Sequence, residues 1–486
     1  MKLILHGILL LLFANLRSYT QVNLQDSMAL VGLYNATGGS SWTNHTNWLA
    51  ANKPVSEWEG VVVSGDRVVS VSLINNNLIG TIPSSIGDLN ALAILDLSGN
   101  TLSGGIPATI NSLTLLESLN LSSNNFIGTV PLLNNLTNLS FCELYDNSLS
   151  GAVPDFSGNL LLFYLDLSFN ALNGTIAGLS VANTPELFYI NLSENNLSGN
   201  IPASLAALTK LETINLNKNQ ITGTIPANLS NLTDLSWLAL SNNLLTGSIP
   251  ATFSTLSNLA TLALEHNQLT GSIPAGLSNI QGLSNLTLHH NQLSGSIPAG
   301  FCTHSFETLS INNNQFTFNG MECLEGNSAI TSLNYASQKT LTIENNSSTL
   351  SVDAGGTLAN NTYTWYKNNV LFTEKTANAT LAVTEAGTYR VEVSNSAATQ
   401  LILLSNPYIF SVLPLTWLNF NASNCSDNVC LQWKTENEQN TAHFEIERSV
   451  DGNNFVPLIK VASQNIPGTH AYSTTDHSPA QGINYY

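Results

Sequence analysis

The stretch LATLALEHNQLTGSIPAGLSNIQG, residues 259–282, is one copy of a pattern that recurs through more than half of the chain. Aligned copies place an asparagine every 23 to 25 residues, at Asn76, Asn100, Asn124, Asn147, Asn170, Asn195, Asn219, Asn243, Asn267, Asn291 and Asn314. A fixed period of this length indicates a solenoid, in which each copy forms one coil and stacking buries its apolar edge. We therefore expect about eleven coils over residues 67–324.

Residues alternate within each copy in a way that predicts a short strand. Leu262 and Leu264 alternate with Thr261, Ala263 and Glu265, so the leucines point inward and the other residues outward. The asparagine that follows carries a donor and an acceptor, and we expect it to satisfy backbone groups at the bend. The later glycine permits a turn there, and the later proline ends the strand.

The head of each copy, L-x-x-L-x-L-x-x-N, and its tail, N-x-L-x-G-x-I-P, resemble the plant-type leucine-rich repeat. The resemblance covers about residues 20–324 and extends to plant receptor ectodomains, pectinase inhibitors and bacterial surface proteins. It implies a mostly β, right-handed solenoid with short helical and 3-10 segments. It also implies recognition or adhesion on a concave face, without naming a ligand.

The N-terminal residues 1–20 carry Lys2 and then an apolar core from Ile8 to Phe13, which favours a secretory signal peptide. Composition agrees with export, because only 9% of residues are charged while the net charge is −18. Such a surface argues against nucleic acid or an anionic membrane as the partner.

Residues 21–66 are expected to cap the first coil. Asp26 or Ser27 can start a helix, and Trp42, Trp48 and Trp58 follow it. Because a solenoid needs its open end covered, we interpret the tryptophans as a plug for the first coil rather than as a ligand site. The segment NATGGSSWTNHTNWL followed by WEGV resembles the cap of bacterial secreted plant-type repeat proteins, without the cysteine pair of plant caps.

Five cysteines remain to be placed. Cys142 occupies an inward position of its strand, which predicts a buried free thiol. Cys302 and Cys323 lie 21 residues apart and can join the last two turns, while Cys425 and Cys430 can bridge a hairpin. Two such disulfides suit an oxidising compartment, and the alternative of a metal site lacks any C-x-x-C pair.

After Leu324 the repeat stops, and we expect a linker over residues 325–336. Residues 337–411 resemble an immunoglobulin-like domain, with Trp365 as core tryptophan and Tyr389 as tyrosine corner. Residues 412–486 resemble a fibronectin-III-like domain that includes Trp433. The second sandwich is expected to be incomplete, because residues 482–486 look like the middle of a penultimate strand.

The apolar stretch from Leu401 to Leu418 has the length of a membrane span. Asn406, Pro407 and Pro414 interrupt it, so we interpret it as a last strand, a linker and a first strand. No direct membrane insertion is predicted.

The fixed register places the outward residues of the strands in columns. One column reads Ile94, Ser118, Phe141, Tyr164, Tyr189, Thr213, Trp237, Thr261, Asn285 and Thr308, and the next reads Asp96, Asn120, Glu143, Asp166, Asn191 and Asn215. Rings beside carboxylates and amides can bind a sugar chain or an extended peptide, although aromatic neighbours also simply stabilise sheets. We predict a ligand surface on the concave face, formed by Phe141, Glu143, Tyr145, Tyr164, Asp166, Tyr189, Asn191 and Trp237.

Two weaker constellations share this face. Glu143 and Asp166 on neighbouring strands nominally match a retaining glycosidase pair, but an open sheet offers no evident enclosing pocket to raise one pKa. His266, His289 and His290 lie near Glu265 and can hold a metal, although solvated histidines at strand ends are the favoured interpretation. We therefore predict no catalytic residues, no metal and no cofactor.

These observations predict a non-catalytic, secreted or cell-surface recognition and adhesion protein that binds a glycan or protein ligand, with the sandwiches as a stalk. The alternative is a targeting fragment of a larger secreted surface enzyme or assembly, whose catalytic part lies beyond residue 486. The sequence leaves the oligomeric state open.

Overall fold

The computed structural model describes residues 21–176, 184–346, 348–411, 415–438, 441–466 and 468–486. The expected signal peptide over residues 1–20 lies outside these ranges. The chain divides into two compact units, of which the first contains the repeat array and the second contains most of the sheets after residue 340. Strand is the main regular structure throughout.

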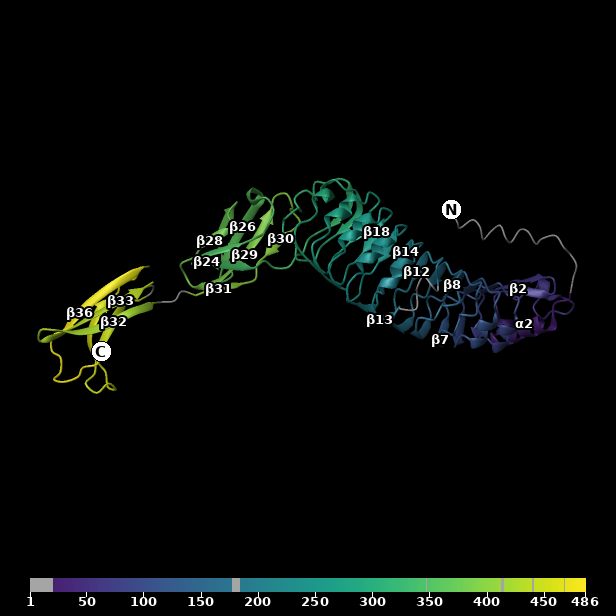
Figure 1. Ribbon diagram of the computed structural model, residues 1–486, viewed down its shortest axis with the longest axis horizontal. Coiled ribbons are helices and arrows are strands. Elements are labelled where there is room, and N and C mark those ends of the chain that lie inside the picture. Colours follow the sequence, from purple (N-terminus) through teal and green to yellow (C-terminus); the bar gives the residue numbers. More distant parts are fainter. Residues whose placement is uncertain (1–20, 177–183, 347, 412–414, 439–440, 467) are drawn as a thin grey trace. The chain divides into compact units, whose positions relative to one another are not determined.

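The repeat array forms one 13-stranded sheet whose strands follow one another in chain order (Figure 1). Its first strand pairs antiparallel with the second, and every later pairing is parallel, as expected for successive windings in one direction. The strands are β1 (Val61–Ser64), β2 (Arg67–Ser72), β4 (Ile94–Asp96), β6 (Ser118–Asn120), β8 (Phe141–Glu143), β10 (Tyr164–Asp166), β12 (Tyr189–Asn191), β14 (Thr213–Asn215), β16 (Trp237–Ala239), β18 (Thr261–Ala263), β20 (Asn285–Thr287), β22 (Phe306–Ser310) and β23 (Ile330–Asn334).

The coils from β2 to β20 each return through a second short strand, and most of them also contain a 3-10 turn. The second strands form two further parallel sheets: β3 (Ile79–Gly80), β5 (Thr101–Gly104), β7 (Asn125–Thr129), β9 (Ser148–Ala152), β11 (Ala171–Gly174), β13 (Asn196–Asn200) and β15 (Gln220–Thr222), then β17 (Thr246–Gly247), β19 (Gln268–Gly271) and β21 (Gln292–Leu293). The 3-10 turns are η3 (Ser84–Asp88), η4 (Ala108–Ser112), η5 (Ala203–Ala207), η6 (Ala227–Asn231), η7 (Ala251–Thr255), η8 (Ala275–Asn279) and η9 (Ala299–Cys302).

The glycine and the proline of the repeat each have a separate role in this return: the glycine permits a turn, and the proline precedes the 3-10 turn. Gly271 has a φ of 79°, which a residue with a side chain adopts only with strain. Pro274 stands immediately before η8, where its missing N–H leaves no orphaned donor.

Leucines and asparagines stabilise the interior of the array together. Leu262 and Leu264 are fully buried, and each such side chain contributes about 1.5–3 kcal/mol. Asn243 shows the role of the asparagine ladder: its Nδ2 donates to the carbonyls of Leu216 at 2.9 Å and Leu240 at 3.1 Å, while its Oδ1 accepts from the N–H of Ile221 at 3.0 Å. One amide thus ties neighbouring coils at the bend, as the sequence predicts.

The N-terminal cap contains helix α2 (Leu24–Ala36) and the short turns η1 (Gly39–Ser41) and η2 (Val55–Glu57). The expected helix start at Asp26 or Ser27 is wrong, because Asn23 is the N-cap and accepts from the N–H of Gln25. Asp26 is instead fully buried, and its carboxylate accepts from the Arg67 side chain and from the N–H of Val68. This cluster fastens the helix to β2.

The three cap tryptophans are buried, as the plug interpretation requires. Trp42 and Trp48 meet edge to face at 4.9 Å between ring centroids, and Trp58 lies 4.7 Å from Trp48. The indole N–H groups of Trp42 and Trp48 donate to the carbonyls of Thr37 and Glu59. The rings therefore cover the first coil, with little surface left for a ligand.

The array extends beyond Leu324, so the expected linker over residues 325–336 is wrong. Strand β23 pairs in parallel with β22, and Gln338 takes the position of the ladder asparagine 24 residues after Asn314. Its Oε1 accepts from the N–H groups of Asn314 and Phe316, and its Nε2 donates to the carbonyls of Ile311 and Tyr335. The repeat pattern requires an asparagine at this position, so it did not identify the glutamine that replaces it.

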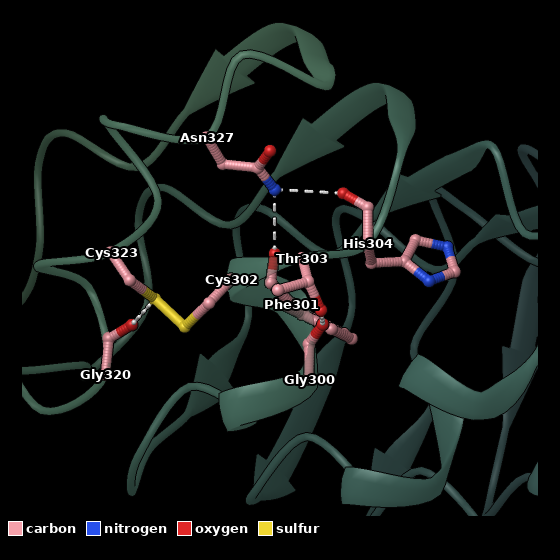
Figure 2. Close-up of a disulfide and its surroundings, with 8 residues drawn as sticks. All are labelled: Gly300, Phe301, Cys302, Thr303, His304, Gly320, Cys323 and Asn327. Carbon is pink, nitrogen blue, oxygen red and sulfur yellow. Dashed lines mark hydrogen bonds between the residues drawn. A yellow bond between two sulfur atoms is a disulfide. The ribbon is translucent and has the colours of Figure 1, made fainter.

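A disulfide between Cys302 and Cys323 joins the last turns of the array (Figure 2). Beside it, the Asn327 side chain donates to the carbonyls of Phe301 and His304 at 3.1 and 3.0 Å. The disulfide and the two hydrogen bonds both fasten the segment that contains Cys323 and Asn327 to the end of η9 in the preceding coil.

Four sheets, with the short turn η10 (Leu358–Asn360), follow the array. They comprise β24 (Ile343–Asn346), β25 (Thr349–Val352) and β28 (Thr380–Ala382); β27 (Val370–Thr376), β26 (Asn361–Lys367), β29 (Gly387–Asn395), β30 (Ile402–Leu404) and β31 (Tyr408–Phe410); β32 (Thr416–Cys425), β33 (Asn428–Glu436) and β36 (Thr469–Asp476); and β34 (His443–Arg448) with β35 (Val456–Ala462). A disulfide between Cys425 and Cys430 closes the β32–β33 hairpin.

The apolar stretch 401–418 contains β30, β31 and the start of β32, with residues 412–414 outside the described ranges. Across those ranges, no helix combines the length and apolar character that a membrane crossing requires. The last residues differ from the expected strand, because Tyr485 forms only an isolated bridge with Ser449.

Candidate functional site on the strand face

The outward residues of the parallel strands form an open surface that we call the strand face. Strand pairing places Phe141 beside Tyr164 and Tyr164 beside Tyr189 in one column, and Glu143 beside Asp166 in the next. The same register continues through Thr213 to Trp237. The two predicted columns are therefore present in the predicted order, because one side chain per coil repeats at the strand spacing.

Phe141, Tyr164 and Tyr189 form a continuous ring stack. Ring centroids are 4.6 Å apart between Phe141 and Tyr164, and 4.2 Å apart between Tyr164 and Tyr189. The interplanar angles are 16° and 2°, so the ring faces cover one another while the ring edges point outward. The three rings are half-buried. A ligand on this surface meets mainly ring edges and hydroxyl groups.

A second aromatic pair supports the stack from the residues just before it. Phe163 and Phe188 stack with centroids 5.6 Å apart, and Phe188 lies 6.2 Å from the Tyr164 ring. Neither was predicted as a site residue. The signal in the sequence was the Phe-Tyr dipeptide that occurs in two consecutive coils, at 163–164 and 188–189.

The carboxylates beside the stack belong to a network of side-chain hydrogen bonds. Asn120 donates to Glu143 at 2.8 Å, and Asn191 donates to Asp166 at 3.0 Å. Ser168 donates to Asp166 through both its hydroxyl and its backbone N–H. Asp166 is nearly fully buried, whereas Glu143 is half-buried and faces the solvent. The amides thus hold both carboxylates in place along the strand face.

Burial, and to a smaller extent the nearby charges of Asp166 and Asp96, together raise the pKa of Glu143 from 4.5 to about 7. Burial also raises the pKa of Asp166, against the hydrogen bonds of Ser168 and Asn191. Near neutral pH, Glu143 therefore exchanges between a neutral and a charged form.

The raised pKa of Glu143 differs from what we expected for an open sheet. We expected no enclosing pocket on the open sheet to raise the pKa of either carboxyl group, yet the pKa of Glu143 is raised to about 7. Partial burial on the strand face is the largest cause of this rise. A raised pKa marks functional sites in general and does not by itself imply catalysis.

The other predicted site residues differ in how much of their surface is exposed. Asn191 is buried between Asp166 and Ser193, so it positions Asp166 and offers little surface. Tyr145 is half-buried at the outward position after Glu143. Trp237 is 46% exposed and follows Tyr189 by two strands, with Thr213 between them. Cys142, below the stack, is a buried free thiol whose pKa burial raises to about 12.

Two profiles of the leucine rich repeat match this chain, one over residues 233–293 and the other over residues 91–113, 115–139, 186–208 and 210–232. These coils are leucine-rich repeats. A probable leucine-rich repeat receptor-like protein kinase of Arabidopsis thaliana is 37% identical over 97 residues, which are 19% of this chain and 10% of that protein.

Two solved structures are also similar to this chain. The plant peptide hormone receptor RGFR1, in complex with RGF2, is 36% identical over 52% of this chain and 40% of that chain, with a TM-score of 0.48. The ectodomain of the receptor kinase GASSHO1/SCHENGEN3 from Arabidopsis thaliana, in complex with CASPARIAN STRIP INTEGRITY FACTOR 2, is 32% identical over 56% of this chain and 36% of that chain, with a TM-score of 0.49. This chain thus spans less than half of either one.

Proposed function

We propose that this protein is an extracellular recognition protein that binds an extended, basic segment of a peptide or protein partner on the strand face. The observation that carries the proposal is the stack of Phe141, Tyr164 and Tyr189, whose exposed edges run beside Glu143 and Asp166. Parallel strands hold each side chain in a fixed register, so the surface is organised before a ligand arrives. Such preorganisation reduces the entropic cost of binding.

The geometry favours a peptide over a sugar chain. A sugar that packs against an aromatic residue needs an exposed ring face. Here both faces of the Tyr164 ring are covered within the stack, where centroids lie 4.2 to 4.6 Å apart. Only one face each of Phe141 and Tyr189 is left, beside the small residues Ser118 and Thr213. An extended peptide instead can place alternate side chains against the ring edges and donate hydrogen bonds to the neighbouring carboxylates.

Charge favours a basic partner. No lysine or arginine occurs between Arg67 and Lys210, whereas nine aspartates and glutamates do: Asp88, Asp96, Glu117, Glu143, Asp146, Asp155, Asp166, Glu186 and Glu194. Glu186 and Glu194 pair with Lys210 and Lys218 of the following coil. The coils that carry the aromatic stack are therefore negative on balance, which favours the approach of a cationic segment. Charge complementarity of this kind speeds association and suppresses wrong partners.

The disulfides support the extracellular location. Cys302–Cys323 and Cys425–Cys430 are both formed, and such bonds persist in oxidising compartments. An N-terminal secretory signal, expected from residues 1–20, agrees with this location.

The sheets after the array serve as a stalk in this proposal. Residues 341–411 fit an immunoglobulin-like domain, because Trp365 is fully buried and the Tyr389 hydroxyl donates to the carbonyl of Glu385 at 2.8 Å, as in a tyrosine corner. Residues 412–486 fit a fibronectin-III-like domain around Trp433.

A binding screen with the full chain tests the function. We expect enrichment of peptides with closely spaced lysine or arginine from a random library, and a loss of at least tenfold in affinity on Tyr164→Ala. Phe169→Ala is the matched control, because this exposed ring belongs to the same repeat and lies outside the stack. Enrichment of acidic peptides, or binding only to a glycan array, contradicts the proposal.

A further inference from the structure

Three histidines gather on the strand face at a separate place from the aromatic stack. His266 follows β18, and His289 and His290 follow β20 on the next coil. One ring nitrogen from each residue can be chosen so that all of them lie within 4.8 Å of one another. His266 and His290 stack at 4.1 Å, and His289 meets both rings edge-on at 5.2 and 5.3 Å.

The backbone explains why the rings converge. His266 and His290 occupy equivalent positions in consecutive repeats and share a left-handed φ of 54°, so their side chains project in parallel from the same corner of the coil. His289 precedes this corner, in the outward column that also contains Glu265 on the coil before it. The coil spacing therefore sets the distances among the rings.

We propose that His266, His289 and His290 bind a divalent first-row transition metal ion of the zinc type. Neutral imidazole is a preferred ligand of such ions. Ligand atoms of a tetrahedral zinc site lie about 3.3 Å apart when zinc–nitrogen bonds are about 2.0–2.1 Å long. The His266 and His290 rings stack at 4.1 Å in the present arrangement, so at least one of these exposed side chains must change rotamer before both lone pairs point at one ion.

Hydrogen bonds already orient the His289 ring for this role. The Ser310 hydroxyl donates to Asn312 at 2.9 Å, so its oxygen is left to accept from Nδ1–H of His289 at 3.2 Å. The lone pair of His289 is then on Nε2. A partner that fixes the tautomer through the second ring nitrogen is the usual arrangement around metal-binding histidines.

His290 and Glu265 complete the surroundings. The Asn313 side chain contacts Nε2 of His290 at 3.2 Å, and its amide can present either a donor or an acceptor to that nitrogen. Glu265, whose carboxylate accepts from the Thr287 hydroxyl, brings a negative charge close to His289. Burial, and then the nearby His266, lower the pKa of His290.

Three protein ligands on an open face leave at least one coordination position free. Water occupies such a position in an isolated protein, and a carboxylate or imidazole of a partner can replace it. The site thus offers a second, metal-dependent contact to a partner on the strand face, independent of the basic segment proposed above.

Calorimetric titration of the chelator-treated full chain with Zn²⁺ tests the proposal. We expect one equivalent to bind and to raise the melting temperature. The variants His289→Gln and the double variant His266→Asn with His290→Asn should each weaken binding at least tenfold. Asparagine tolerates the left-handed backbone at positions 266 and 290, so the double variant is expected to fold.

His477→Asn is the matched control, because this histidine is exposed and far from the cluster in sequence. It should bind Zn²⁺ as the parent does, while Ca²⁺, which prefers oxygen ligands, should leave the melting temperature of the parent unchanged. Equal Zn²⁺ affinity in the parent and in the folded double variant, or no binding by the parent, overturns the proposal. Circular dichroism of each metal-free variant establishes that it is folded.

Discussion

Tyr164 and Tyr189 stand on neighbouring strands with ring centroids 4.2 Å apart and ring planes within 2° of parallel. The backbone register that pairs these residues also pairs Asp166 with Asn191 two positions later. One feature of the solenoid, a single strand residue per coil in each column, therefore produces both the aromatic and the polar half of the candidate surface. We therefore expect substitutions in either half to change ligand affinity while the chain remains folded.

The double variant Tyr164→Ala with Tyr189→Ala should abolish binding of the basic ligand while the chain remains folded. Aromatic neighbours in a sheet contribute about 0.2–1 kcal/mol per pair, so we expect only a small fall in melting temperature. Affinity is measured by calorimetry and stability by thermal unfolding. A large stability loss with unchanged affinity for the remaining folded protein would show that the stack is purely structural.

Glu143→Gln should stabilise the protein at pH 8 more than at pH 4.5. Between its ordinary value of 4.5 and the raised value of about 7, the folded chain retains a proton on Glu143 that the unfolded chain releases. Stability therefore falls as pH rises through this window and is level above it. Because the side chain is partly exposed and screened, we expect a difference of about 1–2 kcal/mol, measured by chemical denaturation. Glu117→Gln, an exposed carboxylate of the preceding coil, is the control.

Ligand affinity should rise with pH around neutrality. Glu143 with a pKa of about 7 gains its charge between roughly pH 6 and 8, and a cationic ligand binds the charged form more tightly. Calorimetric titrations across that range should show tighter binding at high pH in the parent. In Glu143→Gln this dependence should be lost, and its persistence would assign the effect to another group.

Asn243→Ala should destabilise the array by about 1–3 kcal/mol, because the N–H of Ile221 loses its acceptor. The carbonyls of Leu216 and Leu240 each lose one of two asparagine donors and keep the other, from Asn219 and Asn267. Chemical denaturation measures the loss. Asn258→Ala removes only one exposed bond, from its Nδ2 to the carbonyl of Thr233, and should change stability by less than about 1 kcal/mol. Similar losses in both variants would contradict the ladder role.

Gln338→Ala should loosen the last coil. The change removes the acceptor of Asn314 and Phe316 and the donor to Ile311, so we expect a loss of about 1–3 kcal/mol. Hydrogen exchange over Ile330–Asn334 should quicken, while Gln268→Ala, an exposed glutamine of β19, should leave it unchanged. Unaltered exchange in Gln338→Ala would mean that β23 is held by other contacts.

The repeat pattern was sufficient to predict the array, its register and the direction of its strand residues. Successive side chains of a strand point to opposite faces of the sheet. Because the leucines face the interior, Phe141, Tyr164 and Tyr189 must lie in one outward column. The cysteine pairs were also visible, since their spacing matches one coil and one hairpin. Where the residue type changed, the pattern failed: Gln338 continues the ladder and was missed, so β23 was assigned to a linker.

The sequence by itself determined how often the chain turns and which side chains face outward, because periodicity acts through local backbone geometry. Only the tertiary structure decided how those side chains meet across coils. It joined the three rings into a stack, buried Glu143 enough to raise its pKa to about 7, and set the ring nitrogens of His266, His289 and His290 within 4.8 Å of one another. Ring angles, desolvation and ligand spacing depend on distances between strands that are remote in sequence, and no residue pattern encodes those distances.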